Sequence, residues 1–285
     1  MKLFLKSKKN MNYDYIFITS SQLWEQGFYI GSFLNYLGFE PKCKKGLLIV
    51  EHSIKTNKIS YNENHYIESR RLFTLMGFDN TLMLNPHKID YSIKEHPKKN
   101  IVKFAIVGYW LKNQEQLYLA IDNLIYASIE NFKILIIGSY KHIPEKYQKY
   151  VEFYGHLSFK DMYDVLNTCN FLLPMLDAHE PTHFRYINDA VSGTLQLSFG
   201  FLLPMCVNDV YAINYRLNDS NAVIYNGKNL YKALKQAIKM SNEDYSNMQN
   251  SLKSLQEYIY KTSLDNLNNS IYFNNNCDFK TSGDI

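Results

Sequence analysis

The sequence lacks a strong excess of either charge, a cluster of cysteines and any long apolar run. Its 31 lysines and arginines outnumber its 27 aspartates and glutamates only slightly, for a net charge of +4, a balance that does not call for nucleic acid as a partner. The four cysteines show no metal-ligand spacing, and two lie in apolar runs, which is typical of buried thiols in a reducing cytoplasm. No apolar stretch reaches the roughly 18 residues of a membrane span, and no signal peptide is evident.

Several catalytic motifs are also missing. The sequence contains no Gly-x-Ser-x-Gly nucleophile elbow, no Walker phosphate loop and no zinc-ligand spacing. No strand is followed by Gly-x-Gly-x-x-Gly, which argues against an NAD-dependent enzyme. What is present is a globular composition of 285 residues, 46% hydrophobic and 20% charged, enough for one large domain or two small ones. The lysines near the start favour either a solvated charged segment or contact with an anionic lipid surface.

The second half of the chain alternates short apolar strands with helices. Glycine follows three of these strands directly, and a fourth ends at Pro174. This alternation predicts a parallel α/β sheet with right-handed crossovers, in which glycines let the loops crowd over one sheet edge. The expected strands are 103–107, 132–137, 151–154 and 170–173, the glycines are Gly108, Gly138 and Gly155, and the helices span about 114–128, 159–168 and 229–240.

One stretch of this half carries the strongest functional signal. Ser192, Gly193 and Thr194 form a small-residue turn that opens a short apolar helix over 192–203, followed by a strand at 205–207. Serine is a good N-cap, and the first N–H groups of a helix have no partner within the helix. Those amides, the partial positive charge of the helix end and two hydroxyls suit a phosphate, which glycine at 193 allows to approach closely.

The first half is predicted to be a smaller domain of the same class. Its expected strands are 13–19, 46–50 and 81–84, and its expected helices are 22–37 and 64–76. Three strands are few for a Rossmann-like domain, so this half is abbreviated. The predicted organisation is an abbreviated domain at 1–98, a linker over 85–100, a Rossmann-like domain at 101–240, an amphipathic helix within 241–264 and a flexible tail at 265–285.

These pieces together resemble the donor-binding domain of GT-B glycosyltransferases. The order strand–Gly, strand–Gly, Gly–helix, strand–Pro, Ser-Gly-x helix, Pro204 covers roughly 101–240. The Ser192-Gly193 turn is similar to the diphosphate-binding turn of peptidoglycan N-acetylglucosaminyltransferases, and Pro174-Met-Leu-Asp177 is similar to the Pro-Ser-x-x-Glu element of family-four retaining transferases. The resemblance implies two Rossmann-like domains, with a final helix that crosses back to the first.

The resemblance also implies a reaction and its substrates. A nucleotide-diphosphate sugar is the donor substrate, a glycan or lipid-linked molecule is the acceptor, and neither a cofactor nor a metal ion is needed. Bacterial relatives often build capsule, lipopolysaccharide or other surface glycans, which places the expected enzyme in the cytoplasm, at the inner face of the membrane if it associates with lipid. The alternative is a non-catalytic protein of this fold that supports a partner glycosyltransferase.

The donor-side candidates follow the strands and surround the phosphate helix. Lys112 and Arg185 would balance diphosphate charge, although a surface lysine and an ordinary salt bridge are the competing interpretations. Asp177, His179 and Glu180 fill a polar loop that either binds sugar hydroxyls or is simply solvated. Backbone groups near Gly108, Gly138, Tyr154 and Gly155 would hold the nucleotide, with core packing as the alternative for the last two. The family's ribose-binding glutamate would fall inside the 192–203 helix, where this sequence offers only Gln196.

The acceptor-side candidates are Glu51 and His52, which follow a strand of the first half. In an inverting enzyme one of them would be the base that deprotonates the acceptor hydroxyl, with Asp177 as a further catalytic candidate. A histidine after a strand is also often structural. The missing ribose glutamate and the small first domain favour the non-catalytic alternative, whereas His52 and the polar 177–186 loop favour catalysis.

Overall fold

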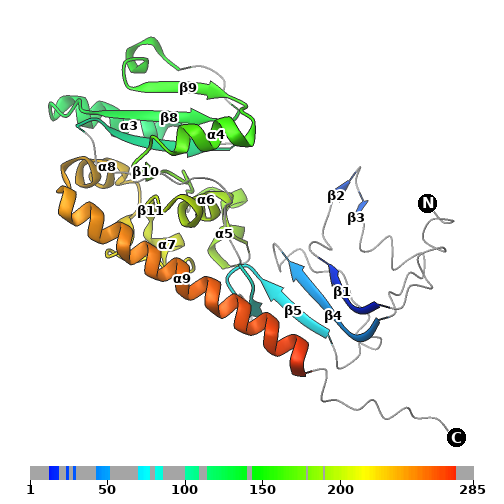
Figure 1. The fold of residues 1–285 in the computed structure, drawn as a ribbon. Coiled ribbons are helices and arrows are strands. Elements are labelled where there is room, and N and C mark those ends of the chain that lie inside the picture. The colour runs from blue at the N-terminus through cyan, green and yellow to red at the C-terminus, as the bar shows by residue number, and fades with distance from the viewer. Residues whose placement is uncertain are drawn as a thin grey trace, which may run out of the picture. The chain divides into compact units, whose positions relative to one another are not determined.

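The computed structural model describes most of the second half of the chain and parts of the first. The described residues are 13–18, 24–25, 28–29, 43–51, 70–77, 81–85, 100–108, 114–139, 143–177, 179–188 and 190–273. The chain divides into two compact units (Figure 1). Unit 1 comprises residues 1–86, 189–191 and 259–285, and unit 2 comprises residues 87–188 and 192–258.

Unit 2 is built on a parallel sheet in the order β9-β8-β7-β10-β11-β12. The first four strands are hydrogen-bonded neighbours, and a parallel bridge between Leu172 and Met205 joins β10 to the β11–β12 pair. Because sequence order reverses between β7 and β10, the topological switch point lies between them, where ligands of open α/β sheets bind. The strands are β7 (Val102–Val107), β8 (Phe132–Ile137), β9 (Val151–Gly155), β10 (Phe171–Leu172), β11 (Cys206–Asn208) and β12 (Val223–Tyr225).

The helices of unit 2 begin and end close to the positions predicted from the sequence. Buried apolar side chains on both faces of β7 and β8 explain why these strands read as continuous apolar runs. Helices α3 and α8 pack side by side against this sheet (Figure 1). The helices are α3 (Gln114–Tyr126), α4 (Phe159–Leu166), α5 (Arg185–Asn188), α6 (Gly193–Phe201), α7 (Asp209–Ala212) and α8 (Leu230–Lys239), with 3-10 turns η2 (Glu145–Tyr147) and η3 (Pro181–His183).

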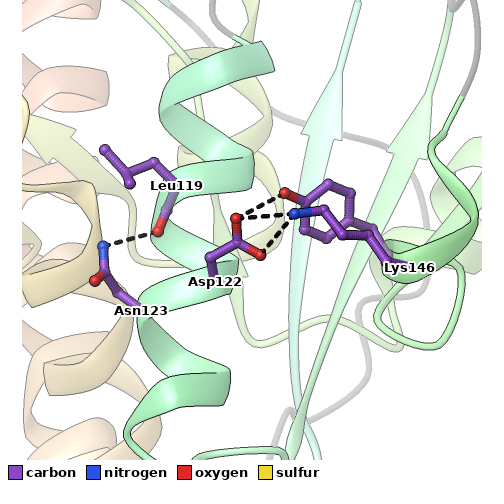
Figure 2. Close-up of polar contacts among 5 residues, drawn as sticks. Leu119, Asp122, Asn123 and Lys146 are labelled. Atoms are coloured by element: carbon purple, nitrogen blue, oxygen red, sulfur yellow. Dashed lines mark hydrogen bonds and ion pairs between the residues drawn. The ribbon is translucent and has the colours of Figure 1, made fainter.

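The carboxylate of Asp122 holds α3 to η2 (Figure 2). Asp122 accepts hydrogen bonds from Lys146 Nζ, at 3.1 and 3.2 Å, and from Tyr147 Oη at 2.9 Å. The adjacent residue, Asn123, donates from Nδ2 to the carbonyl of Leu119, one turn earlier in α3, at 2.8 Å. The contact is mostly exposed, so it fixes the position of η2 more than it adds stability.

Unit 1 contains a second parallel sheet in the order β1-β4-β5-β6, together with a short antiparallel β2–β3 pair. The strands are β1 (Tyr13–Ile18), β2 (Trp24–Glu25), β3 (Phe28–Tyr29), β4 (Cys43–Glu51), β5 (Arg70–Thr74) and β6 (Leu82–Met83). This sheet confirms the predicted strands at 13–19, 46–50 and 81–84.

Both predicted helices of the first half are wrong where the structure describes them. The helix expected over 22–37 is replaced at its start by the β2–β3 pair. The helix expected over 64–76 is replaced by β5, an interior strand between β4 and β6. Phe73 and Thr74 are completely buried in that position, so burial within the sheet overrides the local helical pattern.

The final helix α9 (Asn242–Phe273) is longer than predicted, because it continues past 263 into the segment expected to be a flexible tail. Its residues up to 258 belong to unit 2, and the later ones belong to unit 1. Leu267 and Ile271 pack against the buried Phe73 and Leu84, which gives the asparagine-rich end a surface on which to fold. Among the helices of the described segments, none is long and apolar enough to cross a membrane.

Candidate functional site

Three glycines come together at the carboxyl ends of β7, β8 and β9. The Gly108 N–H donates to the Ile137 carbonyl at 2.9 Å, and the Gly138 N–H donates to the Gly155 carbonyl at 2.8 Å. Their φ angles are +105°, +131° and +66° in chain order, values that favour glycine. A Cβ at Gly138 would lie 2.4 Å from the Gly108 oxygen. The predicted glycines therefore lie together at the carboxyl ends of three neighbouring strands, and the backbone at Gly138 leaves no room for a side chain.

The start of α6 lies beyond the switch point and has the predicted cap. Ser192 is the N-cap, and its Oγ accepts a hydrogen bond from the Thr194 N–H at 3.3 Å. Gly193 is exposed, and a Cβ built on it would meet nothing within 4 Å. No described residue accepts a hydrogen bond from the Gly193 N–H. This end of the helix therefore offers an open amide between two buried hydroxyl-bearing residues, Ser192 and Thr194, and a negatively charged group is favoured at the amide.

Two further groups approach the same helix end. The Ser192 N–H donates to Tyr215 Oη at 3.0 Å, and the Tyr215 side chain is completely buried. Burial raises the pKa of Tyr215, whereas the Ser192 bond and the nearby charge of Arg185 act to lower it. Arg185 is exposed, and its guanidinium lies 4.7 Å from the ring centre of Tyr186 and donates to Tyr186 Oη at 2.7 Å. Arg185 is thus an electrostatic neighbour of Tyr215, the residue that binds the Ser192 amide.

The polar turn after β10 is closed by its own hydrogen bonds. The Asp177 N–H donates to Nδ1 of His183 at 3.0 Å, and Asp177 Oδ1 accepts from the His179 N–H at 2.8 Å. Glu180 caps η3 through the Thr182 N–H at 3.2 Å. His179 is exposed and half of the turn faces solvent. His183 was not predicted from the sequence, yet its ring fixes the backbone at Asp177.

Two buried tyrosines, Tyr211 and Tyr225, are electrostatic neighbours of Asp177. Tyr211 on α7 is completely buried, and burial together with the charge of Asp177 raises its pKa. Burial also raises the pKa of Tyr225, again with a contribution from Asp177. Sequence reasoning missed Tyr211 and Tyr215, because nothing distinguishes them among 24 tyrosines. Tyr211 and Tyr215 are four residues apart and follow the helix-capping Asn208, so a helical spacing is the signal that could have placed them on a common face.

Gln196 and Tyr154 occupy different environments from those of the phosphate turn. Gln196 lies one turn into α6, and its Nε2 is buried without a hydrogen-bond partner in the described part of the chain. Tyr154 is 38% exposed at the end of β9, where its hydroxyl donates to Glu152 at 3.2 Å. Tyr154 is therefore accessible from solvent beside Gly155, whereas Gln196 is half-buried and its Nε2 atom is closed to solvent.

Three of the predicted site residues, the acceptor-side Glu51 and His52 and the donor-side Lys112, have no described side chain. His52 and Lys112 lie outside the described residues, and for Glu51 only the backbone is described, as the last residue of β4. Among the described side chains, no three His, Cys, Asp or Glu residues are close enough to hold a metal ion.

A separate cavity of about 570 Å³ lies away from the switch point. Asp219, Gln236, Lys239, Asp244 and Ser251 are among its lining residues, which come from α8, α9 and the 219–220 turn. No strand end of the sheet contributes to it, so it does not coincide with the site predicted from the sequence.

No protein-family model matches the sequence, and no curated protein sequence matches it. Several solved structures share its fold. One chain in the crystal structure of accessory secretory protein 1, 2 and 3 in Streptococcus pneumoniae aligns at a TM-score of 0.60 and 10% identity, over 96% of this chain and 57% of that chain. Anabaena HepE in complex with UDP and glucose aligns at a TM-score of 0.56 and 12% identity, over 93% and 80% of the two chains.

A variant of S. aureus TarM in complex with fondaparinux, α-GlcNAc-glycerol and UDP aligns at a TM-score of 0.52 and 13% identity, over 84% of this chain. The chain spans about half of the TarM chain, 54% of its length. Identities this low are informative about the fold alone. With its two parallel sheets, its shortened first unit and its final helix shared between both units, the chain has the α/β fold of GT-B glycosyltransferases.

Proposed function

We propose that the protein is a glycosyltransferase that moves a sugar from a nucleotide-diphosphate sugar to a glycan or lipid-linked acceptor. The observation that carries this proposal is the start of α6, where an open Gly193 amide, the hydroxyls of Ser192 and Thr194 and nearby Arg185 gather beyond the switch point. A departing nucleotide diphosphate needs stabilisation of its negative charge, which helix ends and cations supply.

The remaining roles are assigned by position. The backbone edge at Gly108, Gly138 and Gly155 leaves room for the nucleotide, with Tyr154 exposed beside it. Asp177 is the carboxylate beside the transferred sugar. Lys112 adds charge at the diphosphate, and His52 with Glu51 deprotonates the acceptor hydroxyl. The reaction proceeds without a metal ion in this proposal, at the inner face of the cell membrane, in the synthesis of a bacterial surface polysaccharide.

The proposal is tested at Gly193. A Gly193→Val variant should fold normally, because a Cβ at this position meets nothing and the backbone is not left-handed. Its branched side chain would stand where the phosphate approaches, so the affinity for UDP or GDP should fall by about tenfold or more, which corresponds to about 1.4 kcal/mol. Gly193→Ala is the matched control and should lose less. Unchanged affinity of the folded valine variant, measured by calorimetry, would sink this placement of the diphosphate.

The second candidate function is a non-catalytic protein that supports a partner glycosyltransferase. It is favoured by the 192–203 helix, which offers only Gln196 and no ribose-binding glutamate, and by the fold shared with a structure of accessory secretory proteins. The two functions differ in the effect of His52→Ala. In an inverting enzyme, loss of a general base lowers the transfer rate by about 10²–10⁴-fold while nucleotide binding and melting temperature persist. A supporting protein shows no transfer in either form.

A further inference from the structure

The hydroxyl of Tyr211 is a buried polar group without a partner. The side chain is completely buried on α7, directly after β11, and its Oη makes no hydrogen bond within the described part of the chain. Buried hydroxyls in folded proteins are nearly always hydrogen-bonded, and an unsatisfied one carries a free-energy cost. A buried hydroxyl without a partner is therefore a candidate for a functional role.

The surroundings of Tyr211 are those of the candidate site. Helix α7 packs against α5, which follows the turn after β10, and the charge of Asp177 acts to raise the pKa of both Tyr211 and Tyr225, in addition to the larger effect of burial. Tyr215, one helical turn further on, is also an electrostatic neighbour of Tyr211 and binds the Ser192 amide at the start of α6. Tyr211 thus lies among groups that flank both the turn after β10 and the proposed diphosphate position.

We propose that Tyr211 is a specificity-determining residue, whose hydroxyl binds a hydroxyl of the donor sugar together with the carboxylate of Asp177. This inference rests on the proposed function. A sugar hydroxyl can donate its proton to the carboxylate and accept the proton of the phenol, so both groups are satisfied at once. The negative charge of Asp177 disfavours a phosphate in the same place, so the sugar and not the diphosphate is the part of the donor that fits.

The hydroxyl is closed to solvent in this structure, so a neighbouring group must move aside when the sugar enters. The test therefore compares ligands with and without the sugar. UDP-glucose, UDP-N-acetylglucosamine and GDP-mannose are titrated into the wild-type protein by calorimetry, and the tightest binder is then compared with its parent nucleoside diphosphate in each variant.

The key variant is Tyr211→Phe, which removes one unpaired hydroxyl and nothing else. Its melting temperature should equal or exceed that of the wild type, because no hydrogen bond is lost. Its affinity for the nucleotide sugar should fall by about two- to tenfold, the usual effect of one lost hydrogen bond, while its affinity for UDP or GDP stays unchanged. Tyr215→Phe is the matched control. It leaves the buried Ser192 amide unpaired, so its melting temperature should fall.

Three results would overturn the inference while leaving the proposed function intact. The first is a Tyr211→Phe protein that binds the nucleotide sugar as tightly as the wild type. The second is an equal loss of affinity for the nucleoside diphosphate, which would place the hydroxyl at the nucleotide. The third is a melting temperature lowered as much as in Tyr215→Phe, which would make the hydroxyl structural. A wild-type protein that binds none of the nucleotide sugars would overturn the proposed function and the inference together.

Discussion

A single buried serine ties α9 to the sheet of unit 1. Ser263 is completely buried, its Oγ donates to the Ile259 carbonyl at 2.7 Å, and the same oxygen accepts from the Asn85 N–H at 2.8 Å. Asn85 follows β6 and is itself 2% exposed. Replacement of Ser263 by alanine would therefore remove the acceptor of the backbone N–H of Asn85, which lies in a buried position where water cannot replace that acceptor.

The free-energy cost of the lost hydrogen bond can be separated from the helix effect with a matched variant. An unsatisfied buried donor costs about 1–3 kcal/mol, offset by up to about 0.7 kcal/mol because alanine is the better helix former. Ser270 lies on the same helix, is also buried, and donates to the carbonyl of Asn266 at 2.7 Å, four residues earlier. No second bond to its oxygen is present among the described residues, so Ser270→Ala carries the same helix effect without the stranded amide.

Thermal unfolding and hydrogen exchange measure the two variants. Ser263→Ala should be less stable than Ser270→Ala by about 1–3 kcal/mol, and each kcal/mol lowers the melting temperature by about 2–4 °C in a chain of this size. The Asn85 amide should lose its protection from exchange in Ser263→Ala and keep it in Ser270→Ala. Equal stability of the two variants, or an Asn85 amide that stays protected in both, would refute this account of the contact.

Two further predictions concern the sheet edge and alkaline pH. Gly138→Ala should destabilise the folded protein more than Gly108→Ala does. Both glycines have a positive φ, which costs about 1–2 kcal/mol for another residue, but only the Cβ at 138 would clash, 2.4 Å from the Gly108 oxygen, and equal melting temperatures of the two variants would contradict this. Burial raises the pKa of the Cys169 thiol to about 12, so its contribution to stability is complete below the unfolded pKa of about 8.5 and is lost as the pH rises toward 12. Denaturant midpoints should therefore fall between about pH 8 and pH 10.5, and less steeply in Cys169→Ala; an identical slope in the variant would argue against the thiol as a cause.

The success of sequence reasoning differs between the two units for a physical reason. Strands β7 and β8 are buried on both faces, so continuous apolar runs such as Phe132–Ile137 mark them without ambiguity. The Ser192 cap of α6 is equally local, because the side chain and the amide that it binds are two residues apart. Strand β12 was not predicted, since Val223–Tyr225 is only three residues long and is defined by its pairing with β11.

Unit 1 depends more on distant contacts. The Arg70–Thr74 segment carries two arginines and was predicted as part of a helix, yet it pairs with β4 on one side and β6 on the other. The end of α9 is similar, because asparagine-rich sequence is a poor helix former. Its helical conformation to Phe273 is supported by Leu267 and Ile271 against the core, and by Asn266 Nδ2, which donates to the Met83 carbonyl at 2.9 Å.

The start of α6 has fewer free amides in the structure than the sequence predicts. The sequence predicts a capped helix end with free amides, and the cap is confirmed. Of those amides, however, Ser192 binds Tyr215 and Thr194 binds the cap oxygen, and the Leu195 N–H donates to the Ser192 carbonyl at 3.0 Å. Only the Gly193 amide is left without a described acceptor. If a diphosphate binds here as proposed, one amide, two hydroxyls and Arg185 must hold it, so Gly193 is the position where a side chain should weaken binding most.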